Sequence, residues 1–213
     1  METTLQQIQS LAPSPTSLPP KPQQKAGTRQ TLRVAVLGRV GCGKSTISRK
    51  FARLALEQKR RVLVVTSHEE EWLNFPLVHP RFPQRIATYV GGRRIVVHSR
   101  KAAYEAIGMF RHGLLILDDC RRYLPTSQDD DVEELVISTR QKDVDLLVVC
   151  HNFEQLPPVF FTFIDYFFLF PTQGNLRRRK DYFADYDRME AAVRQINEMG
   201  KQDPHTFKII KNE

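Results

Sequence analysis

Eight residues near the start of the chain fit a pattern that binds phosphate. Residues 38–45 read GRVGCGKS, which matches G-x-x-x-x-G-K-[ST]. Glycines let the backbone curl so that its N–H groups point inward at phosphate oxygens, where side chains would obstruct them. Lys44 would reach the β- and γ-phosphates, and the Ser45 hydroxyl would ligate Mg²⁺. The residues expected to hold ATP are Gly38, Arg39, Val40, Gly41, Cys42, Gly43, Lys44, Ser45 and Thr46.

Two carboxylates follow an apolar run later in the chain. Residues 114–117 read LLIL, and Asp118 and Asp119 come next. A buried strand that ends in acidic residues is typical of the second half of a nucleotide-phosphate site. Asp118 is placed to hold the metal ion with Ser45, and Asp119 could act as a general base on the attacking water. The two motifs together predict magnesium-dependent hydrolysis of ATP.

A basic cluster lies toward the end of the chain. Arg177, Arg178, Arg179 and Lys180 follow Gly174 and Asn175, which predicts four positive charges in a loop. Such charges suit contact with nucleic-acid phosphates without reading of bases. A solubilising charge run or an oligomer contact would give the same pattern. Arg93 and Arg94 form a weaker second patch.

Alternating elements must position these residues. Short β-branched runs separated by helical stretches predict a mostly parallel α/β sheet with helices on both faces. The expected strands are Leu32–Leu37, Arg61–Thr66, Arg94–His98, Leu114–Leu117, Leu146–Cys150 and Tyr166–Phe170, with Thr206–Ile210 as a possible edge strand. The expected helices are an amphipathic one carrying Ile47, Phe51, Leu54 and Ala55, and those at Val132–Arg140 and Asp185–Met199. Gly200 follows the last as its cap.

The composition suggests one globular domain with an appendage. Residues 1–30 are rich in Pro, Ser, Thr and Gln and predict a flexible arm, whereas residues 31–213 predict one domain, with 174–213 supplying the basic loop, a helix and the edge strand. The 213 residues are too few for two comfortable domains. The 41% hydrophobic and 26% charged fractions argue against global disorder or a coiled-coil rod.

The charge and the cysteines bear on partner and compartment. Thirty-two Lys and Arg against 24 Asp and Glu leave a net charge of +8, which favours a polyanionic partner if the charges cluster. Three cysteines without paired spacing indicate neither a disulfide framework nor a zinc site, and so predict a reducing, cytoplasmic compartment. No apolar run has the length of about 18 to 20 residues that a membrane helix needs, so we expect a chain that is not itself transmembrane.

Two segments resemble the FtsK–HerA superfamily of DNA-pumping ATPases. Residues 114–125, LLILDDCRRYLP, are similar to its Walker B region, and Arg140-Gln141-Lys142 with residues 145–152, DLLVVCHN, resemble its arginine followed by a strand ending in a polar sensor. The similarity covers about residues 32–170. In size and in the His-Asn after the sensor strand, the chain is most similar to the small genome-packaging ATPases of tailless icosahedral viruses with an internal membrane. The resemblance implies a RecA-like P-loop NTPase fold of the additional-strand type.

The resemblance also assigns roles to single residues. It implies that His151 is a sensor that hydrogen-bonds the γ-phosphate or its water, and that Arg140 reaches a neighbouring subunit's nucleotide as an arginine finger. Arg121 and Arg122 compete with Arg140 for that role, and a salt-bridged surface arginine would give the same pattern. The family's usual catalytic glutamate is replaced by the shorter Asp119, so Glu69 or Glu70 could supply the base instead.

The function that this resemblance implies is ATP-driven translocation of DNA. We expect a viral genome-packaging ATPase that acts as a homo-oligomeric ring, hexameric by the resemblance, on double-stranded or single-stranded DNA in the host cytoplasm, with a capsid vertex or membrane protein as a further partner. Other hypotheses remain open: a motor of DNA transfer or filamentous-phage extrusion, a P-loop kinase of small molecules, and a nucleotide switch that does not hydrolyse ATP.

Overall fold

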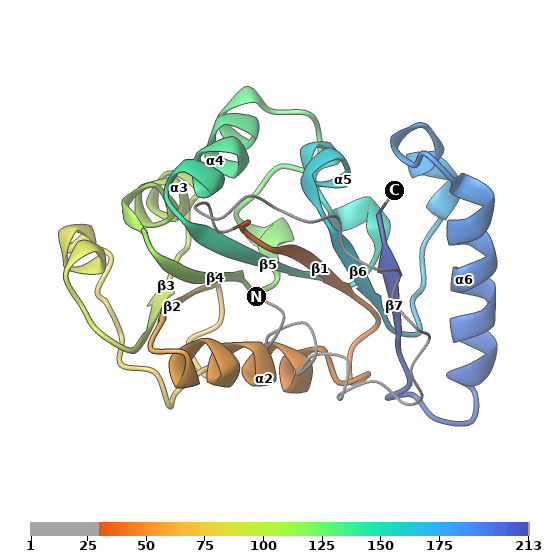
Figure 1. The fold of residues 1–213 in the computed structure, drawn as a ribbon, viewed down its shortest axis with the longest axis horizontal. Coiled ribbons are helices and arrows are strands. Elements are labelled where there is room, and N and C mark those ends of the chain that lie inside the picture. The colour runs from red at the N-terminus through yellow and green to blue at the C-terminus, as the bar shows by residue number, and fades with distance from the viewer. Residues whose placement is uncertain (1–29, 213) are drawn as a thin grey trace.

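Seven strands form one sheet in the computed structural model, which describes residues 30–212 (Figure 1). The strands are β1 (Arg33–Leu37), β2 (Arg61–Thr66), β3 (Gly92–Val96), β4 (Gly113–Leu117), β5 (Val144–Cys150), β6 (Tyr166–Leu169) and β7 (Lys208–Lys211). All pairings are parallel except that of β6 with β7. The predicted arm, residues 1–30, lies outside the described residues apart from Gln30.

The strand order is β3-β2-β4-β5-β1-β6-β7. It places β5 between β1, which leads into the phosphate-binding pattern, and β4, which leads into Asp118. This inserted strand defines the additional-strand type of P-loop fold, and the prediction of fold class is therefore confirmed. Because β1, β4 and β5 are parallel, their carboxyl ends share one edge of the sheet. The residues that follow these strands are Gly38, Asp118 and His151.

Helices cover both faces of the sheet, as the apolar strands predict (Figure 1). Helix α2 (Lys44–Glu57) lies on one face, and α3 (Arg100–Met109), α4 (Asp130–Gln141) and α5 (Pro158–Phe163) lie on the other. Neighbouring residues of β1 divide between two cores: Val34 and Val36 pack with α2, whereas Ala35 and Leu37 pack with the opposite helices. Burial on both faces gives the central strands a fixed position beneath the candidate site.

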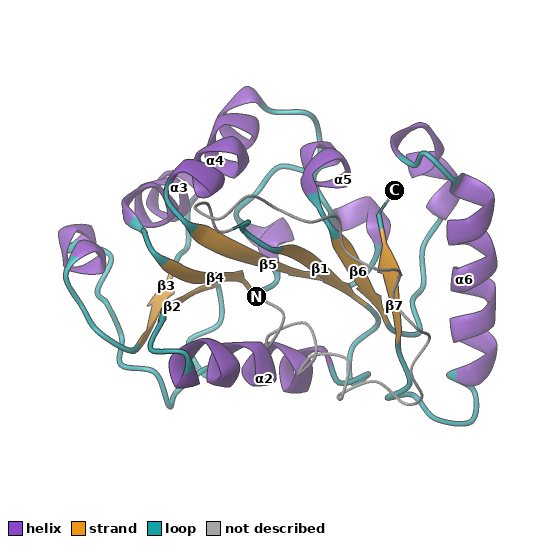
Figure 2. Ribbon diagram, in the orientation of Figure 1, coloured by secondary structure: helices purple, strands orange, loops and turns teal. Residues whose placement is uncertain are grey.

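The connections carry four short 3₁₀ helices, η1 (Pro83–Ala87), η2 (Cys120–Arg122), η3 (Phe153–Gln155) and η4 (Leu176–Tyr182). The long segment between β2 and β3 is mostly loop (Figure 2). Helix α3 has no counterpart among the sequence expectations. No helix of residues 30–212 is long and apolar enough to cross a membrane.

The last part of the chain adds helix α6 (Tyr186–Met199) and the edge strand β7. The expected edge strand at Thr206–Ile210 forms as β7, which begins two residues later, ends one residue later and lies antiparallel to β6. One expectation was wrong: the four basic residues 177–180 lie in η4 and not in a loop. The Asn175 side chain accepts a hydrogen bond from the backbone N–H of Arg177 and caps this short helix, a signal that Asn commonly gives.

Candidate nucleotide site

Glycines shape the phosphate-binding turn between β1 and α2. Gly41 and Gly43 have φ of 79° and 101°, values in the left-handed region that glycine adopts at little cost. At Gly38 a Cβ would lie 2.5 Å from the Phe170 Cβ and 2.6 Å from the Cys42 Sγ, so only glycine fits there. The turn leads directly into α2, whose first residue is Lys44. The N–H groups at this helix start are available to an anion.

Lys44 is buried at the centre of the site. Its Nζ donates hydrogen bonds to the backbone carbonyls of Gly38, at 2.7 Å, and of Arg39, at 2.8 Å. Burial lowers the pKa of Lys44, and the charges of Asp118 and Asp119 oppose that effect. Ser45 is half-buried and Thr46 exposed in the first turn of α2, while Val40 is exposed at the tip of the turn.

Asp118 lies buried just beyond β4 and is held by the indole of Trp72. The Trp72 Nε1 donates to its Oδ2 at 2.8 Å. Burial raises the pKa of Asp118 to about 6, and a hydrogen bond and the charge of Glu71 add to the shift, while the Trp72 hydrogen bond opposes it. Trp72 has a φ of 58°, uncommon for a large residue, and the Arg49 guanidinium of α2 lies over its ring, 5.7 Å from the centroid.

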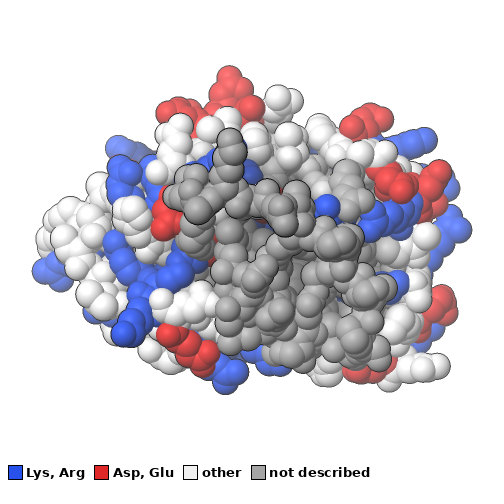
Figure 3. All heavy atoms as spheres, in the orientation of Figure 1, with Lys and Arg blue, Asp and Glu red and all other residues white. Residues whose placement is uncertain are grey.

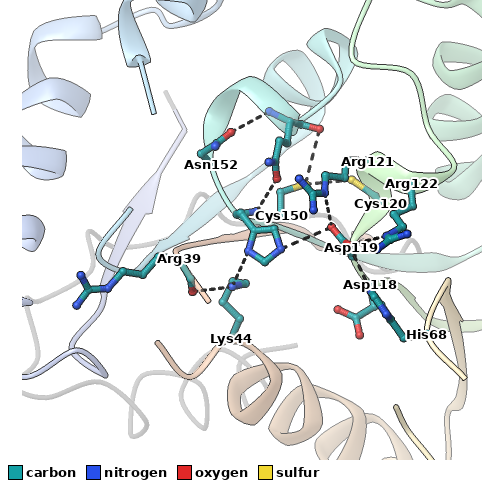
Figure 4. Close-up of polar contacts among 12 residues, drawn as sticks. Arg39, Lys44, His68, Asp118, Asp119, Cys120, Arg121, Arg122, Cys150 and Asn152 are labelled. Atoms are coloured by element: carbon teal, nitrogen blue, oxygen red, sulfur yellow. Dashed lines mark hydrogen bonds and ion pairs between the residues drawn. The ribbon is translucent and has the colours of Figure 1, made fainter. Parts of the chain in front are cut away.

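Asp119 stands among four nitrogen-bearing side chains. Its Oδ1 lies 3.2 Å from Nε of Arg121 and 3.8 Å from Nε2 of His151. Its Oδ2 lies 3.4 Å from Nε2 of His68 and 3.5 Å from Nε of Arg122. Figure 4 shows three of these side chains, His68, Arg121 and Arg122, around the Asp119 carboxylate. The candidate base therefore lies beside two arginines and two histidines, and its position in the sequence alone does not reveal all of these contacts.

His151 joins the two halves of the site. Its Nδ1 lies 3.4 Å from the Lys44 Nζ, and its backbone N–H donates to the Gln155 Oε1 at 3.2 Å. Burial and the charge of Lys44 lower the pKa of His151. The imidazole is therefore neutral near neutral pH and can accept a hydrogen bond on one nitrogen and donate one from the other.

Other candidates lie elsewhere. Arg140 is exposed at the carboxyl end of α4, just before β5 begins, so the seven residues of β5, about 20 Å, separate it from the carboxyl edge of its own sheet. Glu69 pairs with His98 at 3.7 Å, and both side chains are exposed. Glu70 is exposed as well. Of the run of three glutamates, only Glu71 interacts with Asp118.

The basic residues of η4 differ in their contacts. Arg179 is half-buried and donates to the backbone carbonyls of Thr126, at 3.0 Å, and Glu154, at 2.9 Å. Arg178 pairs with the Glu154 carboxylate at 3.1 Å. Arg177 and Lys180 are exposed, and the Lys180 Nζ lies 5.6 Å from the centre of the Tyr186 ring.

A second basic region lies over the end of the sheet that is formed by β2 and β3 (Figure 3). Figure 3 shows Lys and Arg side chains gathered over the end that holds β2 and β3. Arg93 and Arg94 of β3 are half-buried. Arg94 donates to the Glu69 carbonyl at 2.9 Å, and the Arg93 guanidinium lies 5.3 Å from the centre of the Tyr89 ring. Both therefore support the packing of the segment between β2 and β3.

Sequence reasoning did not find three residues of the site. His68, Glu71 and Trp72 all follow β2, the strand next to β4, and reach the two aspartates from there. A His-Glu-Glu-Glu-Trp run directly after an apolar strand was the available signal, since polar residues after neighbouring parallel strands meet at the carboxyl edge. What could not be read was which glutamate points inward.

Comparison with solved structures finds one kind of fold repeatedly. The genome packaging NTPase B204 from Sulfolobus turreted icosahedral virus 2, in complex with AMP, is similar with a TM-score of 0.64 and 15% identity, over 85% of this chain and 92% of that one. The complex of the same protein with ATP-gammaS has a TM-score of 0.61 and 16% identity, over 85% of this chain and 98% of that one. B204, the DNA-packaging ATPase from Sulfolobus turreted icosahedral virus, has a TM-score of 0.58 and 14% identity, over 85% of this chain and 97% of that one. No protein-family model matches the chain, and no curated protein is similar to it in sequence.

At this identity the likeness concerns the fold. The α/β architecture that the sequence predicts is the architecture of these packaging NTPases, and the resemblance to genome-packaging ATPases is confirmed at that level. The matches cover most of both chains, so the likeness concerns the fold as a whole.

Proposed function

We propose that the chain is a magnesium-dependent ATPase that packages a viral genome. The observation that carries the proposal is the meeting of the phosphate-binding turn with the ends of β4 and β5, where Lys44 lies 3.4 Å from His151 and His151 lies 3.8 Å from Asp119. A cation, a neutral imidazole and a carboxylate gathered at a helix start suit the cleavage of a phosphate anhydride.

The donor set fits Mg²⁺, which prefers carboxylate and hydroxyl oxygens. Asp118 and Ser45 would hold the ion, with the phosphates and water as its other ligands. Burial raises the pKa of the Asp118 carboxyl to about 6, and a divalent cation would stabilise its charged form. When bound, Mg²⁺ neutralises charge that develops on the phosphate oxygens.

The chain's own residues divide the remaining work. The N–H groups of the turn and Lys44 bind the triphosphate, for which the Lys44 ammonium exchanges its two carbonyl partners. Asp119 accepts a proton from the attacking water. His151, held by Gln155 through its backbone, donates a hydrogen bond to the γ-phosphate or the water, and so senses whether the phosphate is present.

Coupling to nucleic acid is assigned to η4 and to neighbouring subunits. Arg177 and Lys180 are exposed and would contact DNA phosphates, with Arg178 and Arg179 beside them. Arg140, remote from its own site, would act on a neighbour's nucleotide in a homo-oligomeric ring. We expect this ring to be a hexamer in the host cytoplasm, bound to a capsid vertex or membrane protein. The similarity in fold to B204 proteins, described as genome-packaging and DNA-packaging, supports packaging as the purpose.

The test measures ATP hydrolysis by the full chain with and without double-stranded or single-stranded DNA. We expect turnover that requires Mg²⁺, rises with DNA and is lost in Lys44→Ala, while Lys201→Ala, an exposed lysine of the helix-to-strand connection paired with Glu198, behaves as wild type. Failure to bind Mg-ATP at millimolar concentration would contradict the whole proposal. Turnover that needs a small phosphate acceptor would indicate a kinase, and binding without turnover a switch.

A further inference from the structure

Both oxygens of the Asp119 carboxylate are engaged by positive side chains of the same short helix. Nε of Arg121 lies 3.2 Å from Oδ1, and Nε of Arg122 lies 3.5 Å from Oδ2 (Figure 4). His68 adds a contact to Oδ2 at 3.4 Å. A general base needs an oxygen lone pair directed at the water that it deprotonates. In this arrangement a guanidinium group lies within ion-pair distance of each oxygen.

The two arginine side chains are more exposed than the Asp119 carboxylate, so they are freer to move away from it than it is to move away from them. The Asp119 side chain is 12% exposed, whereas those of Arg121 and Arg122 are 43% and 54% exposed. The buried Oδ1 accepts no hydrogen bond from the described residues. Its contact with Arg121 is therefore an ion pair only. Half-exposed ion pairs of this kind hold only weakly. A stronger anion near η2 would therefore compete for the guanidinium groups.

Phosphate is such an anion, because a guanidinium fork matches its geometry and charge. The element proposed to meet nucleic acid lies beside the same region. Arg179 of η4 donates to the Thr126 carbonyl, four residues beyond η2, and to the Glu154 carbonyl in the segment that follows His151. A polyanion bound along η4 would thus reach the surface on which Arg121 and Arg122 are exposed.

We propose that Arg121 and Arg122 are positioning residues that hold Asp119 inactive at rest, and that the phosphates of a bound nucleic acid draw them away. This inference rests on the proposed ATPase function. It assigns the two arginines to their own subunit's base, in contrast to a finger that reaches a neighbour's nucleotide. Their departure frees an Asp119 oxygen for the attacking water, so hydrolysis is faster while the nucleic acid is held.

The experiment compares kcat and KM of the full chain, with and without double-stranded DNA, for wild type and the double variant Arg121→Gln/Arg122→Gln. We expect DNA-free kcat to rise about 3- to 10-fold, as for a base whose oxygen is freed, and the stimulation by DNA to fall toward one, with KM little changed. Arg121→Lys/Arg122→Lys, which keeps both charges, should restore a low DNA-free rate. Arg194→Gln, an exposed arginine paired with Glu190 at 2.9 Å, is the matched control and should leave both values unchanged.

Three results would overturn the inference. A fall in DNA-free kcat of the Gln double variant would mean that the arginines act on the substrate, and an unchanged stimulation ratio would mean that they do not restrain Asp119. A wild type that hydrolyses ATP at the same rate without DNA would also contradict release by nucleic acid.

A second measurement does not depend on turnover. Thermal unfolding of Arg121→Gln/Arg122→Gln, Asp119→Asn and the triple variant forms a double-mutant cycle. We expect a coupling between the arginines and Asp119 that disappears at saturating DNA, and no coupling at rest would overturn the inference. If the cycle behaves as expected but no variant hydrolyses ATP, the proposed function fails while the restraint of Asp119 stands.

Discussion

The Lys44 ammonium nitrogen lies 3.4 Å from Nδ1 of His151, so the phosphate-binding turn and the end of β5 are in direct contact. Because burial and Lys44 both lower the pKa of His151, its imidazole is neutral near pH 7 and Nδ1 can accept from the ammonium. Nε2, 3.8 Å from Asp119, then carries the proton. The contact between Lys44 and His151 therefore leaves the protonated nitrogen of His151 on the side of the candidate base, Asp119.

This arrangement predicts how His151 variants behave. His151→Ala removes the donor between Lys44 and Asp119, and we expect kcat to fall by about 100- to 1,000-fold, the size typical when one polar group stops stabilising the transition state. His151→Gln keeps a donor and an acceptor and should recover a large part of the rate. Mg-ATP binding, measured by calorimetry, should change little in either variant. Loss of binding in both would show that His151 builds the turn and does not act in hydrolysis.

The raised pKa of Asp118 predicts a dependence of stability on pH. An aspartate ordinarily has a pKa of 3.8, and in the folded protein the pKa of Asp118 is about 6. Its neutral form therefore stabilises the fold fully below pH 3.8, and that contribution is lost as the pH rises through about 6. Asp118→Asn keeps a neutral group at every pH. Without magnesium we expect its melting temperature to exceed that of wild type by about 6–12 °C near pH 8, by about half as much near pH 5, and by little below about pH 4.

Magnesium supplies the control for that experiment. The ion should stabilise wild type near pH 8 and leave Asp118→Asn unaffected, because the variant lacks the anionic ligand. Hydrolysis by wild type should demand more magnesium as the pH falls below about 6, since the proton and the ion compete for Asp118. Equal melting temperatures of the two proteins near pH 8 would contradict the buried, charged carboxylate.

Trp72 is the only tryptophan of the chain, and its indole donates to Asp118. Its fluorescence should therefore report magnesium and nucleotide at the site directly. We expect Mg-ATP to change the emission of wild type, and Asp118→Asn to weaken the response to the ion. Trp72→Phe keeps an aromatic ring but removes the hydrogen bond, and kcat should fall by about 10- to 150-fold, as for one missing hydrogen bond to a charged group. An emission insensitive to saturating Mg-ATP would argue against a metal at Asp118.

Much of the fold follows from the strands alone. The apolar runs that became β1, β2, β4, β5 and β6 are buried on both faces, so composition and length were enough to find them. The position of β5 between β1 and β4 was implied only by the family resemblance, because nothing local in a strand encodes its neighbours. The helix at Arg100–Met109 was missed although Ser99 caps it, since its apolar stripe is short.

The sequence predicted the parts of the candidate site that consist of residues close together in the chain. It did not predict the contacts between segments that are far apart in the chain. Lys44 and Asp118 belong to local sequence patterns from which a role can be proposed, whereas Trp72 reaches Asp118 across 46 positions of sequence. The four basic residues of η4 look equivalent in sequence. Their contacts divide them, because Arg179 supports backbone carbonyls of two other segments while Lys180 stays exposed.

Gly38 predicts a contrast between two glycine substitutions. Gly38→Ala would place a Cβ 2.5 Å from the Phe170 Cβ and 2.6 Å from the Cys42 Sγ, and the neighbouring backbone must shift. We expect a loss of about 1–3 kcal/mol, as for overpacking of a core, together with weaker Mg-ATP binding. Gly108→Ala in α3 meets nothing within 4 Å and should stabilise the protein by about 0.5–1 kcal/mol. Chemical denaturation measures both, and a Gly38→Ala protein as stable as wild type would contradict the close packing of the turn.

The division within η4 yields the final prediction, which concerns the salt dependence of DNA binding. Arg177 and Lys180 are exposed, so Arg177→Gln/Lys180→Gln should reduce the slope of log K against log salt by about 2, one unit for each phosphate that is no longer neutralised. Thermal stability should be unchanged. Arg179→Gln leaves the Thr126 and Glu154 carbonyls without their donor, so it should lower the melting temperature and affect DNA binding only as the fold loosens. Equal slopes for wild type and the Arg177/Lys180 variant would mean that η4 does not meet the phosphate backbone, and the DNA contact would then have to lie on another basic surface.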